Sequence, residues 1–329
     1  MTSDSSYSFK QPMLKQAFKK IRNIEILGII LTLLVECIIL SLLSPYFLTA
    51  KNIINVLRAI SINAIVTVGM TMVLISGGLD LSVGSVIGLG GMVTAFFLTN
   101  LGVSLPIALI AGIGIGAIIG YTISLFVTKL NINSFIVTLG FLSVARGIIY
   151  LFSTGANIKV TNPIVLYLGQ GTVGVVPVSV ILMAVIGIIG AIFLKYSVTG
   201  RYIYAIGGNE RAARLSGIRV ENVRMLVFIL TSSLAAFAGV MIIGKLGTAE
   251  VIAGTGAEID IIAAVIIGGT SLSGGKGSIL GSLIGAAIIG VLRNGFVILG
   301  LPIAAQTIGI GVVVILSVTI DSLRSRKSA

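Results

Sequence analysis

Ten long apolar segments, separated by short polar stretches, divide this sequence and limit what it can fold into. A helix of about 20 apolar residues spans the roughly 30 Å hydrocarbon core of a bilayer. Within lipid, every backbone N–H and C=O must be bonded inside the protein, so segments of this length are expected to be helical. We therefore expect an all-α integral membrane protein. Its transmembrane helices, about ten in number, are expected at residues 24–43, 60–76, 82–99, 103–128, 134–152, 178–195, 225–243, 257–271, 277–299 and 303–320.

The composition agrees with a lipid bilayer as the main surroundings of the chain. Only 10% of its 329 residues are charged and 56% are hydrophobic, whereas about 25% of the residues of a typical soluble domain are charged. The first segment follows several basic residues, as the apolar part of a secretory signal does. It is, however, long enough to span a bilayer, and no small-residue cleavage site follows it. We interpret it as an uncleaved first membrane helix.

The sequence contains no histidine, and Cys37 is its only cysteine. These counts exclude a disulfide bond within the chain, a zinc site made of Cys and His, and a haem iron held by His or Cys. We therefore expect no metal site, and no cofactor bound by this chain itself.

The basic residues gather on alternate connections between the segments. With a cytoplasmic N-terminus, sixteen of the 22 Lys and Arg residues fall in the tails or the inner connections, and four fall outside. This bias follows the positive-inside rule, so it indicates two cytoplasmic termini and requires no nucleic-acid partner. We expect basic tails at 1–23 and 321–329 around one transmembrane domain at 24–320. The outer connections 44–59 and 153–177 are interpreted as surfaces for an external partner or as short interfacial helices.

Residues 196–224 form the longest polar interruption, and they fall on the inner side in this topology. Asn209 is a favourable N-cap, Glu210 begins a short helical stretch, and Gly217 is a natural C-cap. A short helix with a small apolar face would fit a groove in a partner protein. A basic linker held by lipid headgroups is the other interpretation, and the residues alone leave both open.

Three long motifs make this sequence similar to a known family. They are the stretch 77–84, the loop motif 199–210 followed by 213–218, and the glycine-rich stretch 254–277. In this order they resemble the permease subunits of bacterial ABC monosaccharide importers, the ribose-type family. The resemblance implies the vitamin-B12/ribose-type ABC importer permease architecture and a place in the bacterial cytoplasmic (inner) membrane.

The resemblance also implies a function and partners. The chain would translocate a monosaccharide such as ribose, without enzyme activity of its own. Its expected partners are a separate ATP-binding cassette ATPase subunit that binds ATP and Mg²⁺, an external sugar-binding protein, and a second copy of the chain in a homodimer. The residues carried over to ATPase coupling are Gly200, Arg201, Asn209, Glu210, Ala213, Arg214, Leu215, Ser216 and Gly217. Two alternatives stay open, namely import of another small polyol or sugar-derived signal molecule, and ATP-independent transport by a channel or secondary transporter.

The stretch 269–277 has the glycines and the lysine of a phosphate-binding loop but not their spacing. A P-loop has four residues between its first glycine and Gly-Lys, and Ser or Thr follows. Here five residues separate Gly269 from Gly275 and Lys276, and Gly277 follows. We therefore expect ATP hydrolysis in a separate subunit. An intramembrane enzyme that uses Asp80 and Asp260 is not supported by any arrangement of nucleophile and base.

Two glycine-interrupted stretches lie in corresponding halves of the sequence, which is typical of a translocation site. One contains Asp80, and the other contains Asp260 and the short apolar run 261–267. Seven residues between positions 76 and 88 recur at an offset of 197, which suggests an internal repeat with both copies at the inner ends of helices. Asp80 is interpreted either as a cap of the following helix or as a contact with substrate or a gating partner. The candidate path or gate residues are Asp80, Ser82, Asn63, Asp260, Thr270, Ser271, Ser273 and Lys276.

Glycines and arginines within the apolar segments carry two further predictions. Gly112, Gly116 and Gly120 recur every four residues, so they share one helix face and predict a close contact with a neighbouring helix. Arg146 and Arg293 are expected to extend their side chains outward to the membrane surface.

Overall fold

The computed structural model describes residues 11–326 and is almost entirely helical. The outer ends of the two predicted tails, 1–10 and 327–329, lie outside the described residues. The helices are α1 (Gln11–Leu43), α2 (Ala50–Ile75), α3 (Val83–Thr99), α4 (Leu105–Thr128), α5 (Ser134–Ser153), α6 (Pro163–Gln170), α7 (Val178–Tyr196), α8 (Val198–Gly208), α9 (Glu210–Leu215), α10 (Val220–Leu246), α11 (Ala257–Ile267), α12 (Ile279–Ile298) and α13 (Ile303–Arg326). The strands are β1 (Ile158–Lys159), β2 (Thr172–Val173), β3 (Val176–Pro177) and β4 (Thr248–Ala249), paired antiparallel as β1 with β4 and β2 with β3.

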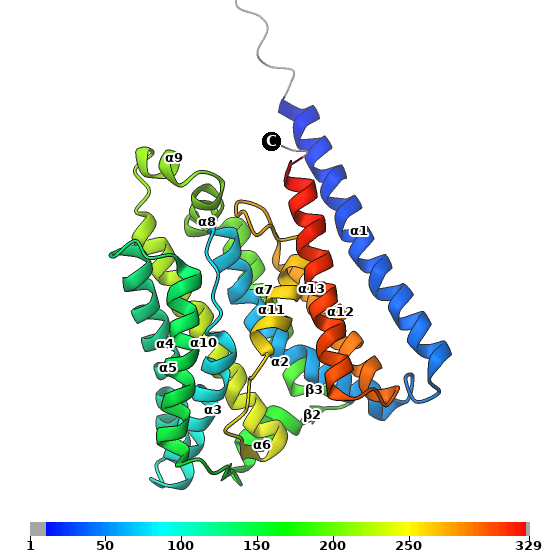
Figure 1. The fold of residues 1–329 in the computed structure, drawn as a ribbon, viewed down its shortest axis with the longest axis vertical. Coiled ribbons are helices and arrows are strands. Elements are labelled where there is room, and N and C mark those ends of the chain that lie inside the picture. Colours follow the sequence, from blue (N-terminus) through cyan, green and yellow to red (C-terminus); the bar gives the residue numbers. More distant parts are fainter. Residues whose placement is uncertain (1–10, 327–329) are drawn as a thin grey trace, which may run out of the picture.

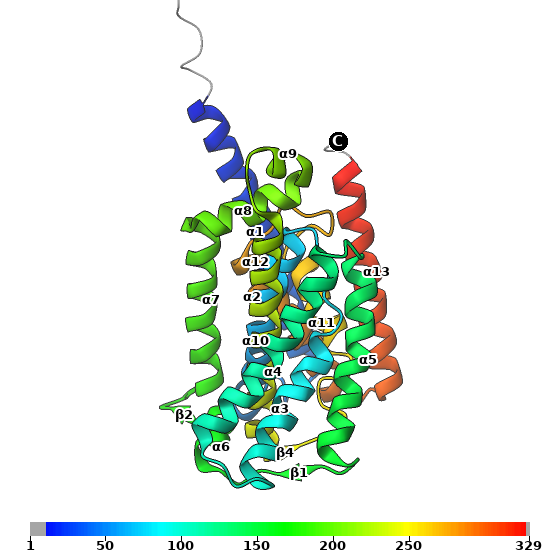
Figure 2. The ribbon, with the colours of Figure 1, turned by 90° about the vertical axis from the view of Figure 1, so that its left-hand side faces the viewer.

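The long helices run side by side and form one bundle (Figures 1 and 2). Helices α8 and α9 lie at one end of this bundle, which we call the α9 end. Helix α1 begins and helix α13 ends at this same end. The four short strands and α6 lie at the opposite end, which we call the α6 end.

Seven helices in the described part of the chain are long and apolar enough to cross a bilayer, namely α1, α2, α4, α5, α7, α10 and α12. Helix α3 and the apolar part of α13 are shorter. Helix α11 has only 11 residues, which at about 1.5 Å per residue covers roughly half of a bilayer core. The predicted eighth segment, 257–271, is therefore not a spanning helix.

Helix α2 begins ten residues earlier than the predicted segment, so residues 50–59 are one continuous helix with it rather than a separate short helix. Thr49 is its N-cap, and its hydroxyl accepts a hydrogen bond from the Asn52 N–H at 3.4 Å. The side chains of Asn52 and Asn294 exchange two hydrogen bonds, at 3.1 and 2.8 Å, and anchor the first turn of α2 to α12. The second outer connection, 153–177, contains the short helix α6 and three of the strands.

Helix α10 packs against α2, α3 and α4, and this group forms the buried core. Leu74, Met92 and Phe228 are among its largest fully buried side chains. The α3–α10 contact is so close that a Cβ added to Gly239 would lie 1.9 Å from the carbonyl oxygen of Ile87. Small residues let helix backbones approach in this way inside a membrane. Large apolar side chains such as Leu42 on α1, which is 82% exposed, suit the surrounding lipid.

Helix α4 approaches α3 and α10 through its glycines. A Cβ on Gly112 would lie 2.7 Å from the carbonyl oxygen of Gly90 on α3. On Gly116 it would lie 2.5 Å from the carbonyl oxygen of Ser232, and on Gly120 2.5 Å from that of Phe228, both on α10. Gly114, on the same helix, has no atom within 4 Å of an added Cβ. The three glycines spaced four residues apart thus lie on the face of α4 that meets its neighbours.

This geometry predicts opposite effects for two matched substitutions on α4. Gly116→Ala is expected to destabilise the protein by about 1–3 kcal/mol, because its Cβ must displace the backbone of α10. Gly114→Ala is expected to be neutral or to stabilise by up to about 1 kcal/mol, because alanine is the better helix former and the site is open. Thermal unfolding of the purified protein in detergent measures both changes. Equal melting temperatures for the two variants would contradict the packing described above.

Helices α3 and α11 are halves of broken crossings, and they meet at their starting ends. Residues 76–82 lead back from the α9 end toward the middle of the bundle, where α3 begins (Figure 1). Residues 250–256 lead from β4 at the α6 end to the start of α11. A Cβ on Gly84 of α3 would lie 2.6 Å from the carbonyl oxygen of Gly254. Non-helical backbone therefore lies in the interior from both ends, covered by the surrounding helices.

Candidate functional site

The predicted short helix of the 196–224 loop is present as α9, and it stands exposed at the α9 end (Figure 1). The side chain of Asn209 caps it by accepting a hydrogen bond from the Ala212 N–H at 2.9 Å. Gly217 follows with a φ of 81°, a conformation that glycine adopts without strain. Leu215 is 84% exposed, whereas Ala213 is 4% exposed and packs against the rest of the protein.

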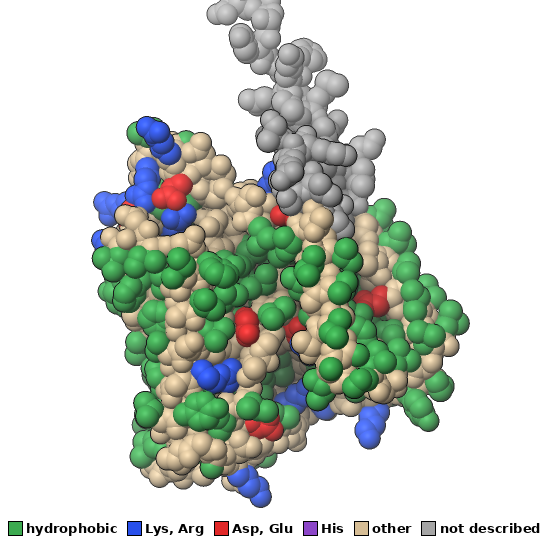
Figure 3. Space-filling view, viewed as in Figure 1, with side chains coloured by type: hydrophobic (Ala, Val, Ile, Leu, Met, Phe, Trp, Pro, Cys, Tyr) green, Lys and Arg blue, Asp and Glu red, His purple; other side chains and the backbone are tan. Residues whose placement is uncertain are grey.

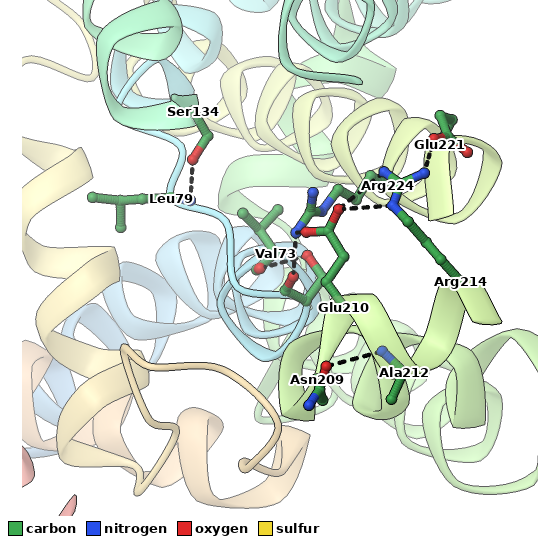
Figure 4. A network of polar contacts seen from close by, with 10 residues as sticks. Val73, Leu79, Ser134, Asn209, Glu210, Ala212, Arg214, Glu221 and Arg224 are labelled. Atoms are coloured by element: carbon green, nitrogen blue, oxygen red, sulfur yellow. Dashed lines mark hydrogen bonds and ion pairs between the residues drawn. The ribbon is translucent and has the colours of Figure 1, made fainter. Parts of the chain in front are cut away.

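Ion pairs hold α9 to the start of α10 (Figure 4). Arg214 binds Glu210 with an Nη2–Oε1 distance of 2.9 Å and also pairs with Glu221. Arg224 binds the other oxygen of Glu210 at 2.7 Å. Partial burial acts to raise the pKa of Glu210, but hydrogen bonds and charges from Arg214 and Arg224 outweigh it and lower that pKa. Glu210 is therefore ionised at neutral pH, and ion pairs hold in place the helix that carries Leu215.

The remaining residues predicted to couple to the ATPase lie around α9 and differ in their exposure. Helix α8 was predicted as loop, and its first turn contains Gly200, whose N–H donates to the Ser197 hydroxyl at 2.8 Å. Gly200 is buried against the end of α7, while Arg201 and Ser216 are exposed. An open groove of about 400 Å³ lies beside α9, between α8 and the start of α10. It is lined by Thr199, Tyr202, Gly217, Arg219, Asn222, Val223 and Leu226.

Asp80 lies in the extended stretch between α2 and α3 and is fully buried. Its Oδ1 accepts hydrogen bonds from the N–H and the hydroxyl of Ser82, at 2.9 and 2.6 Å, directly before the first turn of α3. The residue before Asp80, Leu79, is bonded to the first turn of α5, where its carbonyl oxygen accepts from the Thr138 hydroxyl at 3.3 Å. At Leu79 this stretch is bonded to α5, where the Ser134 hydroxyl accepts from the Leu79 N–H at 3.1 Å (Figure 4).

Asp260, in the first turn of α11, forms an ion pair with Arg293 of α12. The Arg293 Nε and Nη2 atoms lie 2.5 and 2.8 Å from the two carboxylate oxygens. Arg146 of α5 donates from Nη1 to the carbonyl oxygens of Val251 and Ala253, at 3.0 Å each. The prediction that both arginines extend to the membrane surface was wrong. Arg293 holds the start of α11, and Arg146 holds the non-helical residues that precede it. Basic and acidic side chains are visible at mid-height on the face drawn in Figure 3.

The other path candidates lie in the turn after α11 and in α2. Thr270, Ser271, Ser273 and Lys276 belong to the turn 268–278 between α11 and α12. The side chain of Asp321 on α13 fixes this turn by accepting from the Leu272 N–H at 3.2 Å and the Ser271 hydroxyl at 3.3 Å. Asn63 lies halfway along α2. Apart from Asn63, the path candidates thus belong to three segments, namely a capped extended stretch, an ion-paired half-helix and an anchored turn.

These features define a multi-pass helical membrane protein with an exposed ion-paired helix at one end and two broken helices inside, which is the organisation of a transporter. Comparison with known proteins then gives the family. Residues 52–318 match the family described as branched-chain amino acid transport system / permease component, and the chain belongs to this family. It is a permease component and a multi-pass protein of the inner membrane.

Individual relatives confirm the predicted resemblance to ribose-type permeases. The chain is similar to the ribose import permease protein of Escherichia coli strain K12, with 41% identity over 297 residues, 89% of this chain and 92% of the relative. The ribose import permease protein of Bacillus subtilis strain 168 is 40% identical over 301 residues, 91% and 93% of the two chains. The xylose transport system permease protein of Escherichia coli strain K12 is 33% identical over 343 residues, 86% and 87% of the two chains. No solved structure matches the chain.

Proposed function

We propose that this chain imports a monosaccharide such as ribose, with energy from a separate ATPase subunit and with the sugar delivered by an external binding protein. The observation that carries the proposal is the 41% identity to a ribose import permease across 89% of the chain. Helix α9 supplies the site for the ATPase, because it presents an exposed leucine on a frame fixed by charge. ATP and Mg²⁺ bind to that partner in this proposal.

The proposed topology has ten crossings with both termini in the cytoplasm. Seven of these crossings are the seven spanning helices, and the other three contain α3, α11 and α13. The extended stretches 76–82 and 250–256 complete the two short helices. Two observations support a cytoplasmic α9 end: α1 begins and α13 ends there, and the α8–α10 region carries Arg201, Arg211, Arg214 and Arg219.

A homodimer is the proposed assembly, with the sugar path between the two copies. Arg146, Glu258 and Arg293 are partly exposed, although α5 and α12 are membrane-spanning helices. Charged side chains at this depth face protein or water rather than lipid. A second copy placed against these groups by twofold symmetry would enclose them around an aqueous path. The α6 end is then the surface for the sugar-binding protein.

Uptake by reconstituted vesicles tests this proposal. Proteoliposomes that contain the permease, the ATPase subunit, internal ATP and an external binding protein loaded with radiolabelled ribose are expected to accumulate the sugar. Omission of the ATPase subunit is expected to reduce uptake to background. Competition by unlabelled xylose and by a polyol ranks the possible cargoes. Ribose uptake that continues unchanged without the ATPase subunit would contradict an ATP-driven importer and favour a channel or secondary transporter.

A further inference from the structure

We propose that a junction of backbone segments at the α9 end transmits the movement of α9 to both broken helices, and that Gly207 is the positioning residue of this junction. The junction consists of residues 75–77 at the end of α2, Gly207 near the end of α8, and the turn residues 274–277. The proposal rests on the proposed function, because it takes α9 as the place where the ATPase subunit binds.

The three segments touch one another through backbone atoms, with no side chain between them. The Gly275 N–H donates to the carbonyl oxygen of Ile75 at 2.8 Å. A Cβ added to Gly207 would lie 1.7 Å from that same oxygen and 2.5 Å from the Gly275 nitrogen. A Cβ on Gly274 would lie 3.2 Å from the Cα of Gly77. Because no flexible side chain separates these segments, a displacement of α8 must move the other two.

Side chains of α8 and α10 tie the junction to the helix that receives the ATPase. The Tyr204 hydroxyl on α8 donates to the carbonyl oxygen of Gly277 at 2.8 Å. Arg224 on α10 binds Glu210 at 2.7 Å and also donates to the carbonyl oxygen of Ser76 at 3.4 Å (Figure 4). The first residue of α9 is therefore linked through one arginine to the end of α2.

The two segments that α8 contacts lead directly to the two broken helices. Residues 76–82 run from the junction to the start of α3, and the turn 268–278 continues from the end of α11. The starts of α3 and α11 meet again at Gly84 and Gly254 in the middle of the bundle. Packed contacts of this kind switch between discrete arrangements rather than deform gradually. A displacement of α9 would thus reach both sides of the contact between Gly84 and Gly254.

Gly207→Ala tests the proposal, with Gly208→Ala as its matched control. Both changes place alanine at the end of the same helix, but a Cβ on Gly208 has no atom within 4 Å. Uptake of ribose and release of phosphate are measured in the same proteoliposomes. Gly207→Ala is expected to keep ATP hydrolysis within about threefold of wild type and to lower the sugar imported per ATP at least tenfold. Gly208→Ala is expected to retain the wild-type ratio.

Tyr204→Phe keeps the experiment decisive if Gly207→Ala does not fold. Its ring stays in place and the hydroxyl that bonds to the turn residue Gly277 is removed, so the sugar imported per ATP is expected to fall about three- to tenfold. Wild-type ratios for Tyr204→Phe and for any folded Gly207→Ala would overturn the junction and leave the proposed function intact. Uptake by the wild-type protein without the ATPase subunit would instead overturn the proposed function, and the junction proposal with it.

Discussion

Replacement of Arg293 by leucine is expected to destabilise the protein by about 3 kcal/mol and to abolish uptake. Arg293 on α12 binds both carboxylate oxygens of Asp260 on α11, and the Asp260 side chain is only 4% exposed. Loss of one partner of a buried pair leaves an uncompensated charge, which costs about 3–5 kcal/mol. We expect the lower end of this range because the Arg293 side chain is 43% exposed. Thermal unfolding in detergent and vesicle uptake measure the two effects.

Two companion variants separate the buried charge from lost packing. Asp260→Asn alone is expected to cost less than Arg293→Leu, because the partly exposed guanidinium still reaches water when its partner is neutral. The double variant of Asp260→Asn with Arg293→Leu is expected to recover more than half of the loss, because no charge stays buried. A double variant as unstable as the sum of the two single variants would rule out the ion pair as the cause.

Local signals in the sequence were sufficient to predict the exposed helix α9. Asn209 and Gly217 mark its ends through interactions within a few residues, and the structure contains the predicted helix at Glu210–Leu215. The sequence did not predict helix α8, because Gly200, Gly207 and Gly208, considered with their neighbours alone, favour a loop. Their role depends on segments far away in the chain, such as the α2 carbonyl beside Gly207.

The broken helices could be located only in part from the sequence. Glycines and the short apolar run 261–267 indicated an interruption, but the extended stretches also contain apolar residues, such as Leu79 and Val251. Hydropathy therefore does not tell on which side of the break the helix lies. Arg146 was likewise assigned to the surface, because its acceptors are backbone oxygens more than 100 residues away, which no side-chain pattern reveals.

The recurrence of residues at an offset of 197 predicted an internal repeat, and the structure shows where its two copies lie. Gly77 and Gly274, which correspond in this repeat, are neighbours at the α9 end, where a Cβ on Gly274 would lie 3.2 Å from the Cα of Gly77. The two copies are placed differently relative to the short helices, however, because residues 76–82 precede α3 whereas the turn 268–278 follows α11. One half is thus extended near the α9 end, and the other near the α6 end. A repeat in sequence does not fix which part of each crossing becomes helical.

Leu215→Asp is expected to lower uptake about 100-fold without a change in thermal stability. Leu215 is 84% exposed, so its replacement removes no contact within the chain. If α9 inserts into a groove of the ATPase subunit, the leucine becomes the buried apolar anchor, and a carboxylate there costs about 3 kcal/mol of binding. Leu130→Asp is the control, because Leu130 is 62% exposed in the short connection between α4 and α5 and lies outside helix α9. Equal losses in both variants would contradict docking at α9.

Pull-down of the ATPase subunit separates docking from transmission, and it distinguishes Leu215→Asp from the junction variant. Leu215→Asp is expected to lose both the bound ATPase subunit and uptake, because the contact itself is removed. Gly207→Ala is expected to keep the bound subunit and its ATP hydrolysis while uptake fails, because the fault then lies between α8 and the broken helices. The ion pairs of Arg214 with Glu221 and of Arg224 with Glu210 join α9 to the start of α10. Normal ATPase binding by Leu215→Asp together with lost uptake would show that Leu215 acts after docking rather than in it.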